Sequence, residues 1–283
     1  MQQDIFTMGV DIGSSASKCI IMKNGDAIVA KSLASVGAGT SGPEKAINEV
    51  LRQFGGDLSQ ISWICATGYG RNSLKEANKE VSELSCHAKG AHFLFPGVKT
   101  VIDIGGQDVK ALHMDGAGRL LNFVMNDKCA AGTGRFLDVM SRVLETKISD
   151  LAQEGAKSTK KVTISSTCTV FSESEVISHL ANNETIPDVI NGIHRSVASR
   201  IAGLAKRVGV EVPVVMTGGV ASNFEVVRYV SEELNAPIAT SPLSQYNGAI
   251  GAAIYAFEAY RHQLEDDALM PVLQFYLCPY IHV

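Results

Sequence analysis

The chain has 283 residues, of which 46% are apolar and 19% charged, a composition typical of a globular protein with room for two domains. Its net charge of −4 at pH 7 argues against nucleic acid or an anionic membrane as the main partner, because both require clusters of basic residues. No apolar run is long enough to span a membrane and the first residues lack a signal-peptide pattern, so we expect a cytoplasmic protein whose six cysteines are free thiols or metal ligands.

The first part of the chain begins with three predicted strands. They cover residues 6–12, 18–22 and 27–34, and the first runs into the small turn Asp11-Ile12-Gly13-Ser14-Ser15. Asn24-Gly25 predicts a tight hairpin between the second and third strands. This part is completed by a helix with an apolar face at residues 47–54, a strand over 61–66 and a helical segment through 86–91.

The next part of the chain repeats this beginning. An apolar strand enters Asp103-Ile104-Gly105-Gly106, and strands over residues 109–113 and 120–125 follow, with a Gly-containing turn between them. Asp103 stands 92 positions after Asp11, and in both copies a lysine follows the aspartate after seven residues, at Lys18 and Lys110. The shared turn, lysine spacing and hairpin indicate an internal duplication, in which each half opens with a three-stranded antiparallel meander.

The remainder of the chain alternates helices with short strands. Predicted helices cover residues 135–144 and 172–180, a long helix runs from Pro187 to a stop at Gly209, and Asn223 caps a helix that reaches Leu234. Short strands are expected over residues 162–164, 214–216 and 238–240. An Ala- and Gly-rich helix over 246–260 can pack closely on a neighbour, whereas residues 261–283 turn acidic and then apolar and carry no functional prediction.

Both Asp-Ile-Gly turns are suited to phosphate binding. Glycine and other small residues let backbone N–H groups approach oxygen closely, so we expect one phosphate cradle at Gly13, Ser14 and Ser15. A second cradle is expected at Gly105 and Gly106. Either turn alone is explained more simply by a β-hairpin with an acidic strand end, but the pair at a matched offset favours a phosphate site.

Charged and polar side chains beside these turns complete the expected site. Asp11 and Asp103, at the strand ends, would face each other across a cleft and hold a hydrated Mg²⁺, which takes few protein ligands together with phosphate oxygens. Lys18 would neutralise phosphate charge. Gln107 would orient an attacking water, although a surface polar role for it is equally open. Asp11, Asp103 and Gln107 are therefore the candidate catalytic residues.

A third glycine turn, Thr217-Gly218-Gly219-Val220, follows the predicted strand over 214–216. Gly218 and Gly219 can lie flat against an adenine or a ribose, where any Cβ would clash. Alone they indicate only a tight strand-to-helix turn. In order after the two phosphate turns, they complete a nucleotide-binding set.

Two cysteines stand just before predicted helices. Cys129 and Cys168 are therefore placed where a helix N-terminus favours an anion, such as a thiolate or a negatively charged cluster. They are 39 residues apart and the chain has no CxxC motif, which argues against a four-thiolate site closed within one chain. Two chains related by a two-fold axis could supply four thiolates together. For either residue, a buried structural thiol is the alternative.

The other cysteines receive simpler interpretations. Cys19 and Cys65 are flanked by apolar strand residues and are read as buried thiols. Cys86 is next to His87 on a helix, where adjacent side chains do not face one point, so a joint metal site is not predicted. Cys278 lies in the uninterpreted tail.

The order VDIGSSASK, VIDIGGQD, NDKCAAGTGRF, SSTCTVF and MTGGV resembles the ATP-dependent activators of 2-hydroxyacyl-CoA dehydratases, also called component A or archerase. That family belongs to the acetate-and-sugar-kinase, Hsp70 and actin superfamily. The resemblance runs from about Met8 to Tyr260. The phosphate turns indicate the superfamily alone, whereas the two cysteine motifs make the match specific.

The resemblance implies an α/β fold of two duplicated actin/ribonuclease H-like lobes. Each would be a mixed five-stranded sheet flanked by helices, with a nucleotide cleft between the lobes. We expect a first lobe over residues 1–98, onto which the C-terminal helix over about 246–262 packs back. A second lobe over 99–245 would hold the cluster cysteines, and residues 263–283 form an unassigned tail.

The resemblance also implies a cofactor set and partners. Cys129 and Cys168 of two chains would hold one [4Fe-4S] cluster at a homodimer interface, and each chain would bind ATP or ADP with Mg²⁺. The residues that match the nucleotide motifs of the family are Asp11, Gly13, Ser14, Ser15, Lys18, Asp103, Gly105, Gly106, Gln107, Gly218 and Gly219. In such proteins ATP hydrolysis drives a low-potential electron from reduced ferredoxin or flavodoxin to the dehydratase component, and the shared cluster is oxygen-sensitive, as in anaerobic metabolism.

Three other functions fit parts of the same pattern. One is an ATPase component that serves a benzoyl-CoA-type reductase, with the same cluster and a different partner. Another is a small-molecule kinase of the same superfold, for which Gln107 and Asp108 offer polar groups beside the second turn. The third is a non-catalytic dimer bridged by Zn²⁺ through Cys129 and Cys168.

Overall fold

The structure, a computed structural model, describes residues 4–165 and 168–277, with side chains in α8 described as far as Asp266. Five strands form the first sheet: β1 (Phe6–Ile12), β2 (Ser17–Lys23), β3 (Ala27–Ala34), β4 (Trp63–Thr67) and β5 (Lys79–Glu80). Their spatial order is β3-β2-β1-β4-β5. β1, β2 and β3 form an antiparallel meander, while β4 and β5 are added in parallel. Asn24 and Gly25 adopt positive φ angles of 55° and 77°, as the predicted hairpin requires.

The second sheet repeats this topology. Its strands are β6 (Thr100–Ile104), β7 (Val109–Met114), β8 (Leu120–Asn126), β9 (Val214–Thr217) and β10 (Ile238–Ala239). In the order β10-β9-β6-β7-β8, a β6-β7-β8 antiparallel meander is extended in parallel by β9 and β10. The predicted fold of two mixed five-stranded sheets flanked by helices is confirmed.

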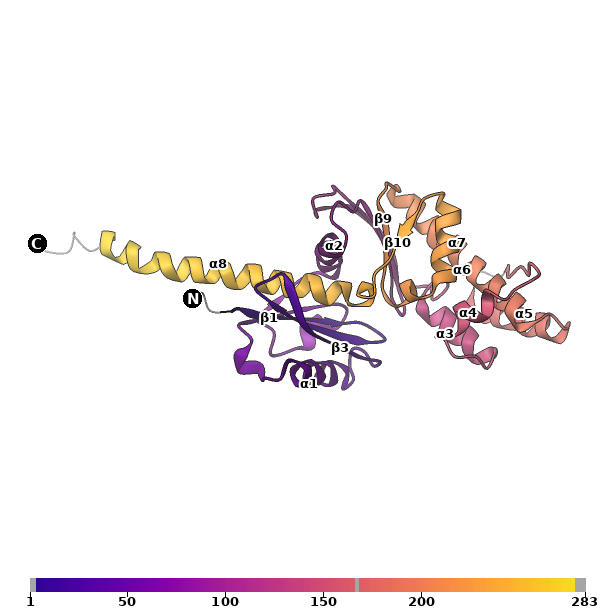
Figure 1. The fold of residues 1–283 in the computed structure, drawn as a ribbon, viewed down its shortest axis with the longest axis horizontal. Helices are drawn as coiled ribbons and strands as arrows, with labels where there is room; N and C mark the ends of the chain where they lie inside the picture. The colour runs from indigo at the N-terminus through magenta and orange to yellow at the C-terminus, as the bar shows by residue number, and fades with distance from the viewer. Residues whose placement is uncertain (1–3, 166–167, 278–283) are drawn as a thin grey trace, which may run out of the picture.

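Helices connect and cover the sheets. The α-helices are α1 (Gly42–Phe54), α2 (Glu83–Leu94), α3 (Gly134–Val143), α4 (Leu151–Gly155), α5 (Thr169–Ala181), α6 (Ile186–Val208), α7 (Phe224–Leu234) and α8 (Asn247–Leu277). Short 3₁₀ turns are η1 (Leu58–Gln60), η2 (Arg71–Ser73), η3 (Gly219–Ser222) and η4 (Ser244–Tyr246). Figure 1 shows α1 below the first sheet, α6 and α7 beyond the second, and α8 running back past the first sheet.

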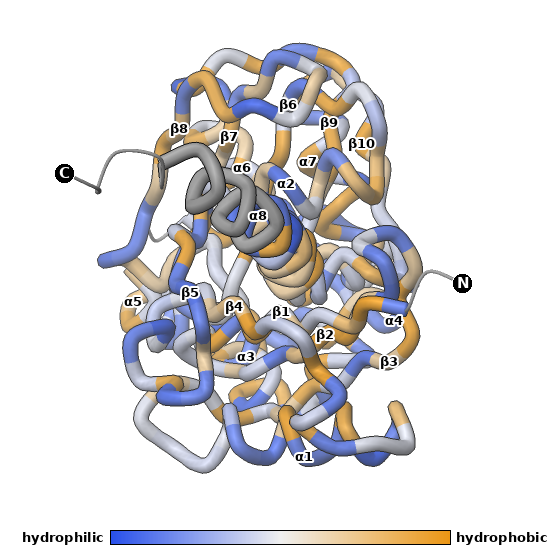
Figure 2. The backbone as a smooth tube through the Cα atoms, turned by 90° about the vertical axis from the view of Figure 1, so that its left-hand side faces the viewer, coloured by the Kyte–Doolittle hydropathy of each residue, from blue (hydrophilic) through white to orange (hydrophobic). Residues whose placement is uncertain are grey.

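α2 and α8 lie between the two sheets, as the view along α8 in Figure 2 shows. On one side of α2, Ala88 and Ala91 pack against Leu112 of the second sheet. On another side, Cys86 packs with Cys65 of β4 and with residues of α8. α2 therefore joins the two lobes through apolar contacts. Among the described residues, no helix combines the length and hydropathy needed to cross a membrane.

Close approach of α8 to its neighbours depends on glycine. A Cβ on Gly9 of β1 would lie 2.0 Å from the Ala249 carbonyl oxygen, and one on Gly251 would lie 1.9 Å from that of Cys86. Any larger residue at these points would push α8 away from β1 or α2. The Ala- and Gly-rich sequence predicted this tight packing. α8 differs from its prediction in length, because it continues to Leu277 instead of ending near residue 260.

The strand predicted over Val162–Ile164 is wrong. These residues belong to neither sheet, yet Val162 and Ile164 are buried in the large core cluster of the second lobe. They pack against α6, where a Cβ on Gly192 would lie 2.8 Å from the Val162 carbonyl oxygen. Helix packing, not strand pairing, explains the apolar alternation that predicted a strand.

Candidate functional site

A cavity of about 460 Å³ opens between the two lobes. It is lined by every residue that the sequence indicated for nucleotide binding and catalysis: Asp11, Gly13, Ser14, Ser15, Lys18, Asp103, Gly105, Gly106, Gln107, Gly218 and Gly219. The two phosphate turns nearly touch, because a Cβ on Gly106 would lie 2.2 Å from Ser15 Oγ. Residues from both halves of the duplication thus surround one space.

Asp11 is buried at the end of β1, with 4% of its surface exposed. The antiparallel register of β1 and β2 places Lys18 opposite it, and Lys18 Nζ lies 3.2 Å from Asp11 Oδ2. Burial would lower the pKa of Lys18, but the Asp11 carboxylate beside it raises the pKa above its ordinary value. The first half of the site therefore contains an ion pair beside the Gly13–Ser15 turn.

Asp103 occupies the equivalent position in the second half, with 2% of its surface exposed. Thr217 Oγ1 donates a hydrogen bond of 2.7 Å to Asp103 Oδ1, and His87 Nδ1 lies 3.2 Å from the same oxygen. Burial would lower the pKa of His87, yet the Asp103 carboxylate raises it to about 10. Burial opposes ionisation of Asp103 as well, but His87 and Lys110 hold its pKa well below the usual range. Both shifts favour the charged forms of His87 and Asp103.

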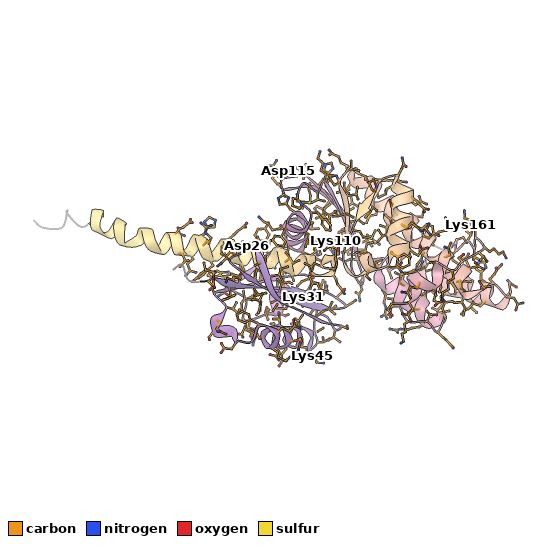
Figure 3. The ribbon with its side chains drawn as sticks, in the orientation of Figure 1. Asp26, Lys31, Lys45, Lys110, Asp115 and Lys161 are labelled. Atoms are coloured by element: carbon orange, nitrogen blue, oxygen red, sulfur yellow. The ribbon has the colours of Figure 1, made fainter. Side chains whose placement is uncertain are left out.

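Lys110 lies at the centre of a buried charge cluster. It is 1% exposed, and its Nζ is 2.8 Å from Glu83 Oε1, 3.6 Å from Asp103 Oδ2 and in contact with Asp108. Burial would raise the pKa of Glu83, but His87 and Lys110 lower it to about 2. Figure 3 shows Lys110 where the two lobes meet. The cluster joins α2, which carries Glu83 and His87, to β6 and β7 of the second sheet.

Sequence reasoning noted the position of Lys110 but missed the roles of Glu83 and His87. The repeated lysine spacing was the signal for Lys110, since Lys18 and Lys110 are equivalent in the two halves. Nothing in the local sequence connects α2 to Asp103. That contact arises only when α2 packs between the sheets.

The third glycine turn, at Gly218 and Gly219, also lines the cavity. Gly218 has a φ of 83°, and a Cβ there would lie 2.2 Å from the Ile104 carbonyl oxygen, so only glycine fits. A neighbouring cavity of about 360 Å³ shares Gly218, Gly219 and Gln245 with the first and extends along Ser241. The two cavities therefore adjoin each other at the third glycine turn. Gln245 and Ser241 were not identified from the sequence.

Gln107 and Asp108 complete the second turn. Gln107 is exposed at the cavity wall. The Gly105 N–H donates to the Asp108 carbonyl oxygen at 2.9 Å and closes the turn. Burial raises the pKa of the Asp108 carboxyl, against the opposite effect of Lys110. Among the described residues, no backbone acceptor outside the strands takes a hydrogen bond from the N–H of Gly106 or Gln107, and both residues line the cavity.

The cysteines divide into two groups. Cys129 and Cys168 are exposed, whereas Cys19, Cys65 and Cys86 are buried; burial raises the pKa of Cys65 to about 12. Cys168 is the N-cap residue of α5, and Cys129 lies in the loop before α3. In residues 4–165 and 168–277, no group of three or more His, Cys, Asp or Glu is arranged to hold a metal ion. Cys278 lies outside the described residues.

Cys129 borders a cavity of about 390 Å³ that is also lined by Met125, Asn126, Arg200 and Arg207. The two arginines add positive charge to the lining of this cavity. Met125 lines both this cavity and the nucleotide cavity. The end of β8 thus separates the two spaces.

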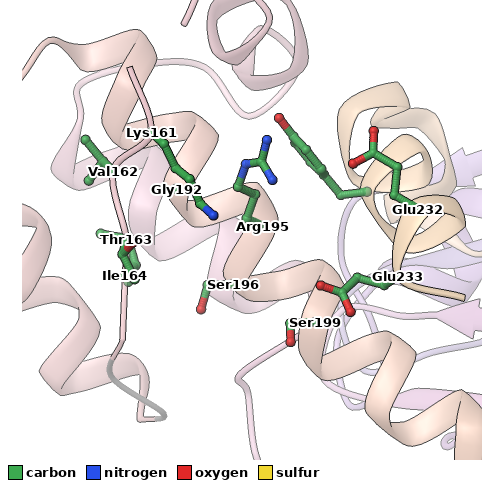
Figure 4. Close-up of a pocket in the computed structure, with 11 residues that line it drawn as sticks. Lys161, Val162, Thr163, Ile164, Gly192, Arg195, Ser196, Ser199, Glu232 and Glu233 are labelled. Atoms are coloured by element: carbon green, nitrogen blue, oxygen red, sulfur yellow. The ribbon is translucent and has the colours of Figure 1, made fainter. Parts of the chain in front are cut away.

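A larger groove, of about 600 Å³, lies between residues 161–164, α6 and α7 (Figure 4). Lys161, Arg195, Glu232 and Glu233 line it with balanced charge. Tyr229 is stacked against Arg195, whose guanidinium carbon is 4.3 Å from the ring centroid. None of the residues predicted from the sequence to bind a nucleotide or a metal lines this groove.

Comparison with known proteins agrees with the two-lobed site. The sequence model of the BadF/BadG/BcrA/BcrD ATPase family matches residues 8–256. The chain is 62% identical over 255 residues to the (R)-2-hydroxyglutaryl-CoA dehydratase activating ATPase of Acidaminococcus fermentans, with 90% of this chain and 98% of that protein covered. It is 31% identical over 268 residues to a component of the benzoyl-CoA reductase of Thauera aromatica, with 91% and 94% covered.

A solved structure of a dehydratase activator is also similar to this chain. The activator of the 2-hydroxyisocaproyl-CoA dehydratase from Clostridium difficile, with bound ADPNP, is 51% identical to this chain. The two superpose with a TM-score of 0.91, over 93% of this chain and 98% of that one.

Proposed function

We propose a specific function for this chain, which belongs to the BadF/BadG/BcrA/BcrD ATPase family and is an ATPase. In this proposal it is the electron-transferring activator of a 2-hydroxyacyl-CoA dehydratase. The observation that carries this proposal is the combination of a two-lobed nucleotide cavity with two exposed cysteines, while the other described cysteines are buried. A nucleotide hydrolase alone does not need such thiols.

ATP would bind with its phosphates between the two turns and its adenosine along Gly218 and Gly219. The buried carboxylates Asp11 and Asp103 fit a hydrated Mg²⁺, because both line the cavity and such an ion needs few protein ligands besides phosphate oxygens and water. Lys18 would balance phosphate charge, and Gln107, exposed at the wall, would orient the attacking water.

Cys129 and Cys168 fit a metal cluster shared between two chains. Each thiol is exposed at a loop that leads into a helix, and the described part of one chain offers no closed set of three ligands. We infer a homodimer in which these two residues of both chains hold one [4Fe-4S] cluster. Such a cluster supplies one-electron transfer at a low potential set by hydrogen bonds and exposure, and its exposure would make the protein oxygen-sensitive.

The partner would be the dehydratase component that accepts the electron, and reduced ferredoxin or flavodoxin would supply it. The relative with 62% identity is named as the activating ATPase of such a dehydratase. The benzoyl-CoA reductase component is 31% identical, so the dehydratase is the favoured partner and the reductase the second candidate.

A reconstituted reaction tests this proposal. The protein, purified without oxygen, is mixed with reduced ferredoxin, ATP, Mg²⁺ and a 2-hydroxyacyl-CoA dehydratase, and dehydration of an (R)-2-hydroxyacyl-CoA is followed. We expect dehydration with ATP, none with ADP, and none with the Cys168→Ala variant despite its ATP hydrolysis. Activation of a benzoyl-CoA-type reductase but not of any dehydratase would reverse the choice of partner, and phosphorylation of a small-molecule acceptor without activation would favour the kinase.

A further inference from the structure

The loop that carries Cys129 spans residues 127–133 and is fixed to the second phosphate turn at both ends. At its start, Asn126 pairs with Val109, the first residue after the turn. At its end, the Gly134 N–H donates to the Gly105 carbonyl oxygen at 3.0 Å, and the Arg135 N–H donates to that of Gly106 at 2.7 Å. The start of α3 therefore rests directly on the turn expected to bind phosphate.

These hydrogen bonds involve peptide groups of Gly105, Gly106 and Gln107, and all three residues line the cavity. The Gly105 carbonyl shares its peptide group with the Gly106 N–H, and the Gly106 carbonyl shares its own with the Gln107 N–H. A phosphate that accepts from these N–H groups polarises the peptides and strengthens the bonds that their carbonyls accept from α3. Occupancy of the turn thus tightens the end of the Cys129 loop. The start of α3 packs closely on the turn, since a Cβ on Gly134 would lie 3.1 Å from the Gly105 carbonyl oxygen.

Within the loop, one side chain holds the backbone of Cys129. Asn126 Nδ2 donates to the Cys129 carbonyl oxygen at 2.9 Å, and the Cys129 N–H donates to Asn126 Oδ1 at 3.2 Å. Further along, the Thr133 N–H and Oγ1 both donate to the Ala130 carbonyl oxygen, at 3.0 and 2.7 Å. Ala131 and Thr133 are buried, so Cys129 is exposed on a loop that is otherwise anchored.

We propose that Asn126 is a positioning residue, which ties Cys129 to the second phosphate turn so that a nucleotide phosphate bound there restrains the cysteine. The inference rests on the proposed function only for the identity of what Cys129 binds. The tie itself belongs to this chain, because it runs through β8, the turn and the start of α3. Asn126 does not line the nucleotide cavity, so it acts on Cys129 and not on ATP directly.

Asn122 offers a matched control on the same strand. It is exposed, and its Oδ1 accepts from the neighbouring Phe123 N–H, at 2.9 Å. Replacing Asn122 removes the same amide group from β8 but leaves the Cys129 loop intact.

Hydrogen exchange at the Cys129 amide tests the tie in the full chain, purified without oxygen, with and without ADPNP. In the wild type and in Asn122→Ala we expect ADPNP to slow this exchange by about fivefold, the factor that one net hydrogen bond supplies. In Asn126→Ala we expect exchange about fivefold faster without nucleotide and no slowing with ADPNP, at an unchanged ADPNP affinity. Slowing by ADPNP in Asn126→Ala equal to that in the wild type would overturn the proposal.

A second variant covers the case in which Asn126→Ala does not fold. Asn126→Asp keeps an acceptor for the Cys129 N–H and loses the donor to its carbonyl, so the ADPNP effect should fall between those of the wild type and the alanine variant. An Asp variant with the full wild-type effect would also overturn the proposal. Iron measured on the same samples reports separately on the cluster: iron-free protein that still shows the ADPNP effect supports the tie while it contradicts the proposed function.

Discussion

Replacing Lys110 with methionine removes the central cation of the buried charge cluster while it keeps most of the side-chain volume. Lys110 is 1% exposed, and its loss leaves Glu83 and Asp103 with one cationic partner in this cluster, His87. The shift of the Glu83 pKa from 4.5 to about 2, in which His87 and Lys110 outweigh burial, corresponds to about 3 kcal/mol in favour of the ionised form. Removing one partner of a buried ion pair costs about 3–5 kcal/mol. We therefore expect Lys110→Met to lower the free energy of unfolding by about 3 kcal/mol at pH 7.

Urea denaturation followed by circular dichroism measures this loss, and Lys23→Met provides the control. Lys23 pairs with Asp4 at 2.8 Å, but both side chains are well exposed, so the control should change stability by less than about 1 kcal/mol. The folded-state pKa of Glu83 is depressed, so its contribution is present above about pH 4.5 and is lost as pH falls towards about 2. The deficit of Lys110→Met should shrink over that window. A deficit below about 1 kcal/mol at pH 7, or one that does not change between pH 5 and 2, would refute the buried-cluster reasoning.

Three further predictions concern the nucleotide site. The pKa of His87 is raised from 6.5 to about 10 because the effect of Asp103 outweighs that of burial. The loss of unfolding free energy in His87→Gln should therefore be greatest below pH 6.5 and decline as pH rises through about 10. A loss that grows as pH rises would contradict this reasoning. Gly218→Ala, at a φ of 83° and with a Cβ 2.2 Å from the Ile104 carbonyl oxygen, should lower the free energy of unfolding and weaken ATP binding at least about tenfold, measured by urea denaturation and calorimetry. Gly219→Ala, whose Cβ would meet only Gln245 Nε2 at 3.6 Å, should weaken ATP binding but leave the free energy of unfolding unchanged. Equal free energies of unfolding in the two variants would argue against a steric role for Gly218. Gln107→Ala should lower kcat for ATP hydrolysis by about 100-fold with little change in KM. A variant with the wild-type kcat would indicate that Gln107 is only a surface polar residue.

Local chemistry explains why the turns were predictable from the sequence. Asp11 and Asp103 each end an apolar strand and are followed by small residues, so strand, turn and register are set by neighbours in the chain. All the residues predicted for the nucleotide site line one cavity, as the repeated motif in the two halves of the chain predicted. The glycine pair at Gly218 and Gly219 was also predictable from the local sequence. Only glycine fits at Gly218, because its φ is positive and the Ile104 carbonyl oxygen is close.

Contacts between distant segments could not be predicted in the same way. Glu83 and His87 reach Asp103 and Lys110 only because α2 packs between the sheets, which no local pattern specifies. The segment at Val162 and Ile164 alternates like a strand, but α6 buries it without strand pairing. The hydrogen bonds from α3 to the phosphate turn likewise join segments whose proximity depends on the folded second sheet.

The central claim is that Cys129 and Cys168 hold an iron–sulfur cluster between two chains, and iron and acid-labile sulfide measured on protein purified without oxygen test it most directly. The account predicts about four irons and four sulfides per dimer, lost in Cys129→Ala and in Cys168→Ala but retained in Cys65→Ala, whose thiol is buried. Protein that contains no iron, that binds zinc instead, or that keeps its iron in both exposed-cysteine variants would contradict it.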